Sequence, residues 1–451
     1  MTWSRYSGET HERTIMRKKN AGLTAESVPV LKRAGHRSLR VPGSKSLTQR
    51  AIMLGCLGAG RTVLSAPLYC DDTMLLTEAM ATLGVGVKWS PNKLVLHGID
   101  GAFPSGGSVN LGAGGTPSRF MIAASCLANE PVTVDGDARM RQRPVGELLT
   151  MLRQLGATID GEHLPVTVQR DGVHGGKLDV PVTQSSQFVS AMLLIAPFLD
   201  GGLTLRCTQP ITSESYVDVT LDMLMNFGVS VTDELTETHR TITVKQTRVT
   251  HQEIDIEPDA SSAVYFAAVA TIHKGLRITL EGLQLDSRQP DAEAIRLLGE
   301  VGADLKDTAL GLQVTGTGII RGFGDLDASR FPDASLCLAA VAAVAESPSR
   351  IFGLETLPLK ESDRIEVMAR SLAKAGCGVG AGISDLRITP FQKNNGPTAI
   401  DPIGDHRIAM SMAVLGTKRS GISIVGPKCV SKSYPNFWKD LREVYEGREA
   451  T

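Results

Sequence analysis

The sequence has few aromatic residues and almost no net charge. Aromatic side chains make up 4% of its 451 residues, so stacking platforms for nucleic-acid bases are not expected. Lysine and arginine number 47 against 48 aspartates and glutamates, for a formal net charge of -1. This balance excludes attachment to nucleic acid or to an anionic membrane through bulk positive charge. Any anionic partner must be bound by a local cluster of cations.

Metal-binding and membrane signals are also missing. The seven cysteines contain no C-x-x-C pair and lie mostly in apolar surroundings, as expected of free thiols in a reducing, cytoplasmic compartment. The nine histidines show no metal-ligand spacing, and no apolar run approaches the ~18 residues of a membrane span. Residues 1–36 are basic, without pattern and without a hydrophobic signal core. We expect them to form a flexible extension or a cleaved organelle-targeting peptide.

Internal repetition is the main positive signal. A helical pattern that ends in glycine and continues into a short alternating segment recurs every 72 to 74 residues. The glycines concerned are Gly84, Gly156, Gly228, Gly302 and Gly376, and Gly447 continues the series 71 residues later. Each follows a helix end, where the left-handed conformation that glycine tolerates is favoured. The sixth unit therefore lacks its following strand.

A second series runs in the same phase as the glycines. Small polar residues that could cap apolar helices recur at Ser44, Thr116, Ser186, Asp259, Asp333 and Asp405. Together the two series predict an α/β fold of six repeated units, and turn signals over residues 254–258 divide them into three and three. We predict one domain over 43–257 and a second over 37–42 plus 258–451. Residues 38–41 are predicted to supply the missing strand of the sixth unit, so that both termini meet in one domain.

Cations cluster at the predicted helix starts, where unpaired amides and the helix dipole favour anions. They are Lys45, Arg50, Arg119, Arg143, Lys360, Arg364, Arg407 and Lys432. Each alone is equally explained as a solvated surface charge or an ion pair. Gathered in one cleft they would repel one another when the cleft is empty, would suit several anionic groups at once, and would draw two domains together around a ligand.

Two of these clusters carry further information. Residues 42–46 read Pro-Gly-Ser-Lys-Ser and imitate a phosphate loop, but Ser44 stands where that motif needs glycine, so a nucleotide site is not predicted. Lys360 and Arg364 are one helical turn apart, an unfavourable like-charge pair unless an anion lies between them. Glu361 beside them is either a proton carrier or their ion-pair partner.

Taken together, the motifs resemble one family, the 5-enolpyruvylshikimate-3-phosphate (EPSP) synthases, from about residue 38 to near the end of the chain. The motifs are Pro42-Gly43-Ser44-Lys45-Ser46, Gly115-Thr116 with Arg119, Arg143-Pro144, Ser185-Ser186-Gln187, Ser213 with Tyr216, Asp259-Ala260-Ser261-Ser262, Pro332-Asp333-Ala334, Lys360-Glu361-Ser362-Asp363-Arg364, Asp405-His406-Arg407 and Lys432. The resemblance implies two domains, each of three α/β units, closing on the substrates. It also implies transfer of the enolpyruvyl group from phosphoenolpyruvate to the 5-hydroxyl of shikimate 3-phosphate, by addition and then elimination of phosphate, in a monomer without cofactor or metal.

The same resemblance assigns roles to residues of this chain. The catalytic group would be Lys45, Asp333, Glu361 and His406, with Asp333 as base and Glu361 as acid at carbon. Phosphoenolpyruvate would be held by Lys45, Gly115, Arg143, Arg364, Arg407 and Lys432. Shikimate 3-phosphate would be held by Lys45, Ser46, Arg50, Ser185, Ser186, Gln187, Ser213, Tyr216, Asp333 and Lys360.

The chain departs from the family pattern at three positions. Ala113 and Thr356 stand where many members carry asparagine, and Phe120 stands where proline commonly follows the arginine. Gly115, in contrast, matches the members that are sensitive to glyphosate, so inhibition by glyphosate is predicted.

Three other functions are weighed against this one. UDP-N-acetylglucosamine enolpyruvyl transferase shares the chemistry, but its reactive-loop cysteine has no counterpart here. An RNA-end cyclase would need a nucleotide site, which is not found. A non-catalytic sensor of small anionic metabolites could use the same cations, but it has no need of an acid and a base at one carbon.

Overall fold

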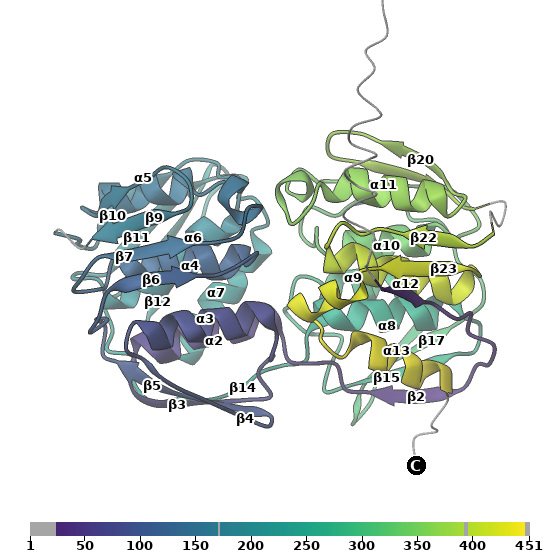
Figure 1. Cartoon of the computed structure of the whole chain (residues 1–451), viewed down its shortest axis with the longest axis horizontal. Helices are drawn as coiled ribbons and strands as arrows, with labels where there is room; N and C mark the ends of the chain where they lie inside the picture. The colour runs from purple at the N-terminus through teal and green to yellow at the C-terminus, as the bar shows by residue number, and fades with distance from the viewer. Residues whose placement is uncertain (1–23, 170–171, 392–395, 447–451) are drawn as a thin grey trace, which may run out of the picture.

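The computed structural model describes residues 24–169, 172–391 and 396–446, and they form two lobes (Figure 1). The buried hydrophobic residues of this part of the chain fall into two clusters. One draws on residues between 51 and 256, and the other on residues 28–41 together with residues between 260 and 444. We call these lobe one and lobe two. Two chain segments, at residues 41–44 and 256–259, cross between them and are hydrogen-bonded to each other.

Both lobes repeat one pattern, in which a helix, a strand and a second helix lead into an antiparallel hairpin. In lobe one the elements are α2 (Lys45–Leu57), β3 (Ala59–Ser65), α3 (Asp71–Thr82), β4 (Gly86–Ser90), β5 (Lys93–Ile99), β6 (Gly107–Asn110), α4 (Gly115–Ser125), β7 (Val132–Asp135), η1 (Met140–Gln142), α5 (Gly146–Gln154), β8 (Thr158–Asp160), β9 (Val166–Gln169), β10 (Gly176–Val180), α6 (Ser186–Ile195), η2 (Ala196–Phe198), β11 (Leu203–Thr208), α7 (Ser215–Asn226), β12 (Val231–Leu235), β13 (His239–Val244) and β14 (Glu253–Asp255). In lobe two they are β1 (Ala25–Ser27), β2 (His36–Leu39), α8 (Ala260–Ile272), β15 (Arg277–Glu281), α9 (Ala292–Val301), β16 (Ala303–Asp307), β17 (Gly311–Gly316), β18 (Gly324–Asp327), α10 (Ser335–Ala342), β19 (Ser349–Phe352), η3 (Leu357–Leu359), α11 (Arg364–Lys374), β20 (Gly378–Ala381), β21 (Leu386–Thr389), β22 (Thr398–Ile400), α12 (His406–Lys418), β23 (Ile422–Val425), η4 (Pro427–Lys432) and α13 (Phe437–Glu446).

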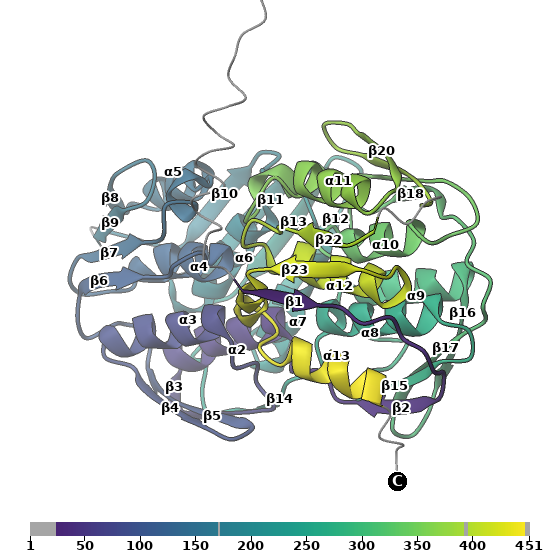
Figure 2. The same ribbon diagram turned by 45° about the vertical axis from the view of Figure 1, so that its right-hand side comes forward.

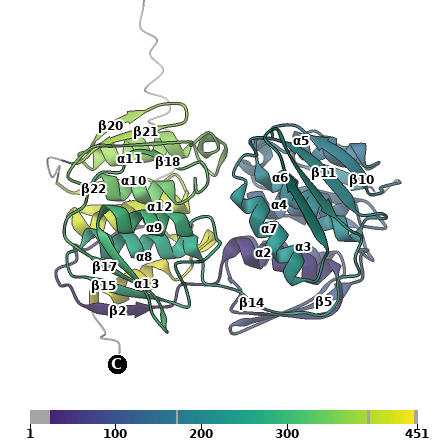
Figure 3. The same cartoon turned by 180° about the vertical axis from the view of Figure 1, so that it is seen from behind.

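The described strands form six small sheets, in keeping with the six predicted units. Three sheets use the strands of one unit only, in the orders β6-β7-β9-β8, β10-β11-β13-β12 and β18-β19-β21-β20. The first and fourth units exchange strands instead, because β14 pairs in parallel with β3, while β2 pairs in parallel with β15. This exchange is what carries the chain between the lobes twice, and Figure 3 shows both connections from behind.

The sixth sheet corrects the predicted strand assignment. Residues 38–41 were predicted to complete the sixth unit, but β2 joins the sheet of the fourth unit. The sixth unit is completed by β1, which pairs antiparallel to β23. Residues 24–36 are therefore not a flexible extension, since β1 is hydrogen-bonded and Val28 and Leu31 are buried in the core of lobe two. Residues 1–23 lie outside the described part.

The two ends of the described chain do meet in lobe two, as predicted. Glu26, in β1, accepts a hydrogen bond from Arg442 of α13, and Arg37 of β2 donates to the carbonyl of Val444. Figure 2 shows β1, β2 and α13 together on this lobe.

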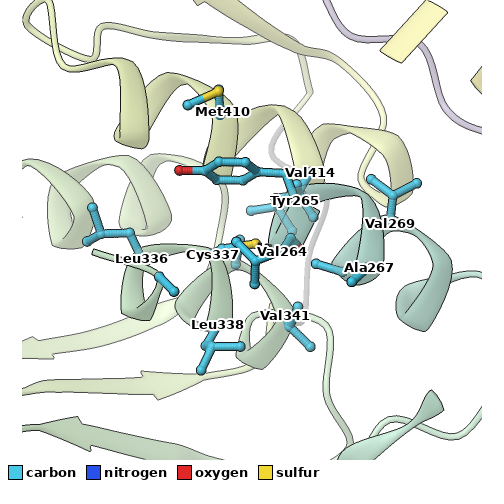
Figure 4. Close-up of a cluster of buried hydrophobic side chains, with 14 of the residues drawn as sticks. Val264, Tyr265, Ala267, Val269, Leu336, Cys337, Leu338, Val341, Met410 and Val414 are labelled. Carbon is cyan, nitrogen blue, oxygen red and sulfur yellow. Dashed lines mark hydrogen bonds between the residues drawn. The ribbon is translucent and has the colours of Figure 1, made fainter. Parts of the chain in front are cut away.

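The core of lobe two is built on α8 and α10, which are apolar on every side, and on α12, which is buried over nearly its whole length. Such helices need cover all round, and α8, α10 and α12 cover one another. Figure 4 shows Val264 of α8, Leu336 of α10 and Met410 of α12 among these buried side chains. Because the helices are held rigidly, the residues at their starts are held rigidly as well. No helix in the described ranges is long and apolar enough to cross a membrane.

The predicted caps are correct at some helices and displaced at others. Ser44 and Asp405 are N-caps whose side chains accept from first-turn amides, of Leu47 and Arg407. Asp259 is the N-cap of α8, but its carboxylate accepts from the hydroxyl of Ser262.

The other three caps differ by one or two residues. The N-cap of α4 is Gly114 instead of Thr116, that of α6 is Ser185 instead of Ser186, and that of α10 is Ala334 instead of Asp333. Sequence does not resolve which of several neighbouring polar residues ends the extended segment before a helix.

The glycine series is confirmed at four of its positions. Gly84, Gly156, Gly228 and Gly376 have φ values of 97°, 99°, 76° and 97°, in the left-handed region. Gly302, with φ 175°, is extended, so its conformation differs from the prediction. Gly447 lies outside the described residues.

Candidate functional site

A cleft between the lobes collects the predicted site residues. It is lined by Lys45, Ser46, Arg50, Asp72, Gly115, Thr116, Arg119, Arg143, Pro144, Gln184, Ser185, Ser186, Gln187, Ser213, Tyr216, Asp333, Thr356, Leu359, Lys360, Glu361, Arg364, His406 and Arg407. Lys432 is not among the lining residues, but its Nζ lies 2.7 Å from Oε1 of Glu361, and Glu361 lines the cleft. All the predicted site residues therefore line the cleft except Lys432, which contacts a lining residue.

On the side of lobe one, the start of α2 presents two cations at different depths. The Nζ of Lys45 lies 3.0 Å from Oδ2 of Asp72. One turn further on, Arg50 is 2% exposed and its guanidinium donates to the hydroxyl of Thr220 at 2.8 Å and to the carbonyl of Tyr216 at 3.0 Å. The ring of Phe120 lies 5.5 Å below it, a cation–π contact at one of the positions that depart from the family pattern.

Gly115 and Arg143 are in close contact at the start of α4. A Cβ on residue 115 would lie 2.6 Å from both terminal nitrogens of Arg143, so the guanidinium fits only because this residue is glycine. The Nε and Nη1 atoms of Arg143 are buried and have no hydrogen-bond partner among the described residues. They are donors aimed at a cleft, available to an anion.

Polar side chains from three neighbouring elements extend this wall. Ser185 caps α6 by accepting from the amide of Gln187, whose side-chain oxygen accepts from Arg119. Ser213, with φ 51°, and Tyr216 come from the turn and helix that follow β11. These hydroxyl and amide groups line the cleft on the side of lobe one.

On the side of lobe two, Arg364 is the centre of the charge network. It is 1% exposed, at the first position of α11. Its guanidinium lies 2.7 Å from Oδ1 of Asp333, 2.8 Å from Oε2 of Glu361 and 2.8 Å from Oδ2 of Asp405. A single buried cation therefore links the predicted base and the predicted acid.

Other cations of the site, from both lobes, contact the same two carboxylates. Arg407 lies 3.1 Å from Asp333, and Lys360 lies 3.5 Å from it. Lys432 lies 2.7 Å and Arg143 lies 3.8 Å from Oε1 of Glu361. The cleft is thus not the repulsive ring of cations that was predicted, because carboxylates lie between the cations. Ligand anions would exchange places with these carboxylates.

The network keeps both carboxylates ionised. Burial alone would raise the pKa of Asp333, but Arg407, Lys360 and Arg364 outweigh it and the pKa lies well below its ordinary value. Burial alone would also raise the pKa of Glu361, but Lys432, Arg364 and Arg143 outweigh it and hold the pKa well below its ordinary value. Both carboxylates are therefore deprotonated. Asp333 is in the form that a base needs but is a weak proton acceptor while its three cations contact it, and Glu361 has no proton to give until its own cations are engaged elsewhere.

His406 is the one predicted catalytic residue whose side chain has no hydrogen-bond partner among the described residues. Its ring is fully buried at the start of α12, and neither nitrogen has a hydrogen bond within the described structure. Burial holds the pKa of His406 well below its ordinary value, so the ring is neutral near pH 7. A neutral imidazole can donate from one nitrogen and accept at the other.

Three acidic residues of the site are not predicted as members of it. Asp72 pairs with Lys45 and Asp405 pairs with Arg364. Oδ2 of Asp291 lies 4.0 Å from Nη1 of Arg407. Burial raises the pKa of Asp291 to about 7. Asp405 was predicted only as a cap, and Asp291 follows Gln289-Pro290 with no distinguishing motif. Residues that act behind a cation carry no sequence signal of their own.

Two positions that depart from the family pattern also face the cleft region. The Oγ1 of Thr356 is buried without a partner among the described residues, and Thr356 lines the cleft. The carbonyl oxygen of Ala113 accepts from Lys432 at 2.8 Å, a contact that does not depend on the side chain at 113. No group of three or more His, Cys, Asp or Glu side chains within the described ranges is placed to hold a metal ion.

The fold and the cleft define a two-lobed α/β protein with a cation-lined cleft between its lobes. The sequence profile of the family described as EPSP synthase (3-phosphoshikimate 1-carboxyvinyltransferase) matches residues 34–441. A protein of that enzyme name from Methanoculleus marisnigri is 37% identical over 405 residues, which cover 89% of this chain and 94% of the relative. One from Tolumonas auensis is 34% identical over 416 residues, covering 90% and 96%.

A solved structure agrees with the sequence comparisons. EPSP synthase from Acinetobacter baumannii superimposes with a TM-score of 0.76 at 26% identity, covering 93% of this chain and 98% of that one. The chain belongs to the EPSP synthase family, and it is a transferase of the 3-phosphoshikimate 1-carboxyvinyltransferase type. This assignment supports the resemblance in the motifs over the related UDP-N-acetylglucosamine enzyme and the RNA-end cyclase.

Proposed function

We propose that the cleft transfers the enolpyruvyl group of phosphoenolpyruvate to the 5-hydroxyl of shikimate 3-phosphate and releases phosphate. The observation that carries this proposal is the joint contact of Asp333 and Glu361 with Arg364, at 2.7 Å and 2.8 Å, inside a cleft lined by cations from both lobes. A base and a latent acid held by one cation suit a reaction that removes a proton from oxygen and adds one to carbon.

The substrates divide between two parts of the cleft. Shikimate 3-phosphate is assigned to Ser46, Arg50, Ser185, Ser186, Gln187, Ser213, Tyr216 and Lys360. Phosphoenolpyruvate is assigned to the region shared by the lobes. There Lys45, Arg143 and Lys432, with the Gly115 backbone, hold its phosphate, and Arg364 and Arg407 hold its carboxylate in bidentate fashion.

The addition step follows from the charges. The hydroxyl oxygen of shikimate 3-phosphate attacks C2 of phosphoenolpyruvate while Asp333, which is ionised, takes the hydroxyl proton. When phosphoenolpyruvate occupies Arg143, Arg364 and Lys432, these cations neutralise the ligand instead of Glu361. The pKa of Glu361 then rises, and the residue takes up the proton that it delivers to the methylene carbon.

The elimination step reverses the proton movement. A proton leaves the new methyl carbon for Glu361, the double bond re-forms, and the bond from C2 to the phosphate oxygen breaks. The proton that Asp333 took from the hydroxyl passes to the departing phosphate. Lys45 stabilises the negative charge that develops there, and the neutral ring of His406 helps to position this proton. These reaction steps require no cofactor.

Release of phosphate tests the proposal directly. Purified protein mixed with both substrates should release phosphate, and UDP-N-acetylglucosamine in place of shikimate 3-phosphate should not support release. Arg407→Ala should abolish turnover while binding of shikimate 3-phosphate is retained, and Asp333→Ala should abolish turnover as well. Absence of phosphate release from the wild-type protein would leave a metabolite sensor as the better interpretation.

The same geometry supports inhibition by glyphosate, an anion that would compete for the phosphoenolpyruvate region beside Gly115 and Arg143. Inhibition that increases as phosphoenolpyruvate is lowered would support this expectation, and no inhibition at high glyphosate would contradict it. We further propose that the protein acts as a monomer in the cytoplasm, since one chain supplies cations to the cleft from both lobes and its cysteines have no C-x-x-C spacing.

A further inference from the structure

Arg139 reaches from lobe one to lobe two without lining the cleft. It precedes η1 in lobe one, and its guanidinium donates to two main-chain carbonyls at the end of η3 in lobe two. Its Nε lies 3.0 Å from the oxygen of Lys360, and its Nη2 lies 2.8 Å from that oxygen and 3.1 Å from the oxygen of Pro358. Charged donors to carbonyls make stronger hydrogen bonds than neutral ones.

The backbone held by Arg139 is the segment that carries two assigned functional residues. Lys360 and Glu361 follow η3 directly, and Arg143 follows Arg139 by four residues. Arg143 lies 3.8 Å from Glu361. One short stretch of lobe one therefore grips one short stretch of lobe two twice, through the backbone with Arg139 and through side chains with Arg143.

Other contacts between the lobes among the described residues are single hydrogen bonds or ion pairs. One of them joins the Nζ of Lys432 to the carbonyl of Ala113 at 2.8 Å. Ser431 donates to Asp71 at 2.7 Å, Ser215 donates to the carbonyl of Arg330 at 2.7 Å, and Arg288 pairs with Asp222 at 2.8 Å. Each is one contact, placed on residues that do not line the cleft. Loss of the Arg139 contacts would loosen the lobes beside Lys360 and Glu361 while these contacts remain.

We propose that Arg139 is an interlobe latch, a positioning residue that holds residues 358–361 against lobe one so that the cleft is complete. It acts through backbone carbonyls and so does not compete with substrate anions for side chains. The latch raises the fraction of molecules whose lobes are closed, and apparent substrate affinity scales with that fraction. The kinetic part of this proposal rests on the proposed function.

Arg141 offers a matched control. It lies two residues after Arg139, within η1, and its guanidinium pairs with Asp135 of its own lobe at 2.9 Å and 2.6 Å. Arg141→Gln removes the same charge from the same segment without touching lobe two. Arg139→Lys is a second comparison, because a lysine has a single cationic group and cannot reproduce the fork that reaches both carbonyls.

The experiment compares steady-state kinetics of the wild-type protein, Arg139→Gln, Arg139→Lys and Arg141→Gln. For Arg139→Gln, KM for phosphoenolpyruvate should rise about tenfold and kcat should change less than about twofold, because saturating substrates close the lobes again. KM of Arg139→Lys should lie between those of the wild type and Arg139→Gln, and KM of Arg141→Gln should match that of the wild type. Equal KM values for the two glutamine variants, or a loss confined to kcat, would overturn the latch.

Small-angle X-ray scattering without substrates provides a readout that does not depend on turnover. Arg139→Gln should have a larger radius of gyration than Arg141→Gln at unchanged thermal stability, and equal radii would count against the latch. If even the wild-type protein releases no phosphate, the proposed function fails, while the comparison of radii still decides the role of Arg139.

Discussion

At the scale of single residues, this site works by crowding opposite charges into a small buried volume. Arg364 contacts three carboxylates, and Asp333 in turn contacts three cations. Burying either set alone would cost several kcal/mol per ion after relaxation. Together they hold each other in place and leave buried donors on Arg143 for the ligand.

Gly115→Ala is expected to weaken binding of phosphoenolpyruvate. The new Cβ would lie 2.6 Å from the terminal nitrogens of Arg143, which must move away. We expect KM for phosphoenolpyruvate to rise about tenfold, equivalent to about 1.4 kcal/mol, with KM for shikimate 3-phosphate nearly unchanged. Gly146→Ala is the control, since a Cβ there meets nothing within 4 Å. Equal kinetics for the two variants would contradict this account of the glycine.

Asp291 should make stability depend on pH. Burial raises its folded-state pKa to about 7, above the ordinary value near 3.9 for an unfolded chain. The folded protein therefore binds this proton more tightly than the unfolded one. The penalty for ionising Asp291 in the fold begins above about pH 4 and grows until the carboxyl is ionised, above about pH 7.

Asp291→Asn removes this titration while keeping a side chain that can accept from Ser261. The melting temperature of the variant minus that of the wild type should therefore increase from pH 5 to pH 8. Each unit of pKa difference corresponds to about 1.4 kcal/mol, which sets an upper scale of about 4 kcal/mol. Thermal melts in matched buffers measure it, and a difference that stays constant with pH would contradict it.

At the scale of elements, the repeat could be predicted because its signals are local. Helix-ending glycines and polar helix starts recur with one phase, and the structure has the six units that they predict in its described part. The exchange of β2 and β14 could not be predicted in this way. Pairing of a strand depends on which sheet edge is free nearby, a long-range choice that the strand's own residues do not record.

The site shows the same division between local and distant information. Cations at helix starts and the acid beside Arg364 are visible in the sequence, and the structure gathers them in one cleft. Asp291, in contrast, is brought behind Arg407 by the packing of α8, α9 and α12. Arg139 cannot be singled out from the sequence, because Arg139, Arg141 and Arg143 lie within five residues and nothing in their order shows which of them faces the other lobe.

Asp363 should stabilise α11 through its cap. Its exposed side chain accepts a hydrogen bond from the amide of Glu366 at 3.1 Å. Asp363→Ala should lower stability by about 1 kcal/mol, which corresponds to a fall of about 2–4 °C in the melting temperature of a unit this size. Asp363→Asn keeps the side-chain acceptor, so its melting temperature should fall much less. Equal melting temperatures for all three proteins would show that the cap is not used in solution.

At the scale of the whole molecule, two separately buried cores are joined by two chain crossings and a few side chains. The cleft is complete only when both lobes contribute, because the assigned phosphoenolpyruvate residues are divided between them. Lys432 represents this dependence well. Its Nζ contacts the carbonyl of Ala113 in lobe one and Glu361 in lobe two. Removing this one cation should change affinity, lobe contact and proton transfer together.

Lys432→Met is expected to raise KM for phosphoenolpyruvate tenfold or more, about 1.4 kcal/mol for each factor of ten, while KM for shikimate 3-phosphate stays within about twofold. Because Lys432 is the foremost cation lowering the pKa of Glu361, its loss should also raise that pKa and move the pH dependence of kcat/KM for phosphoenolpyruvate toward higher pH. Lys428→Met is the matched control, an exposed lysine of the same η4 segment. A variant that loses affinity for both substrates equally, with an unshifted pH profile, would mean that Lys432 only supports the fold.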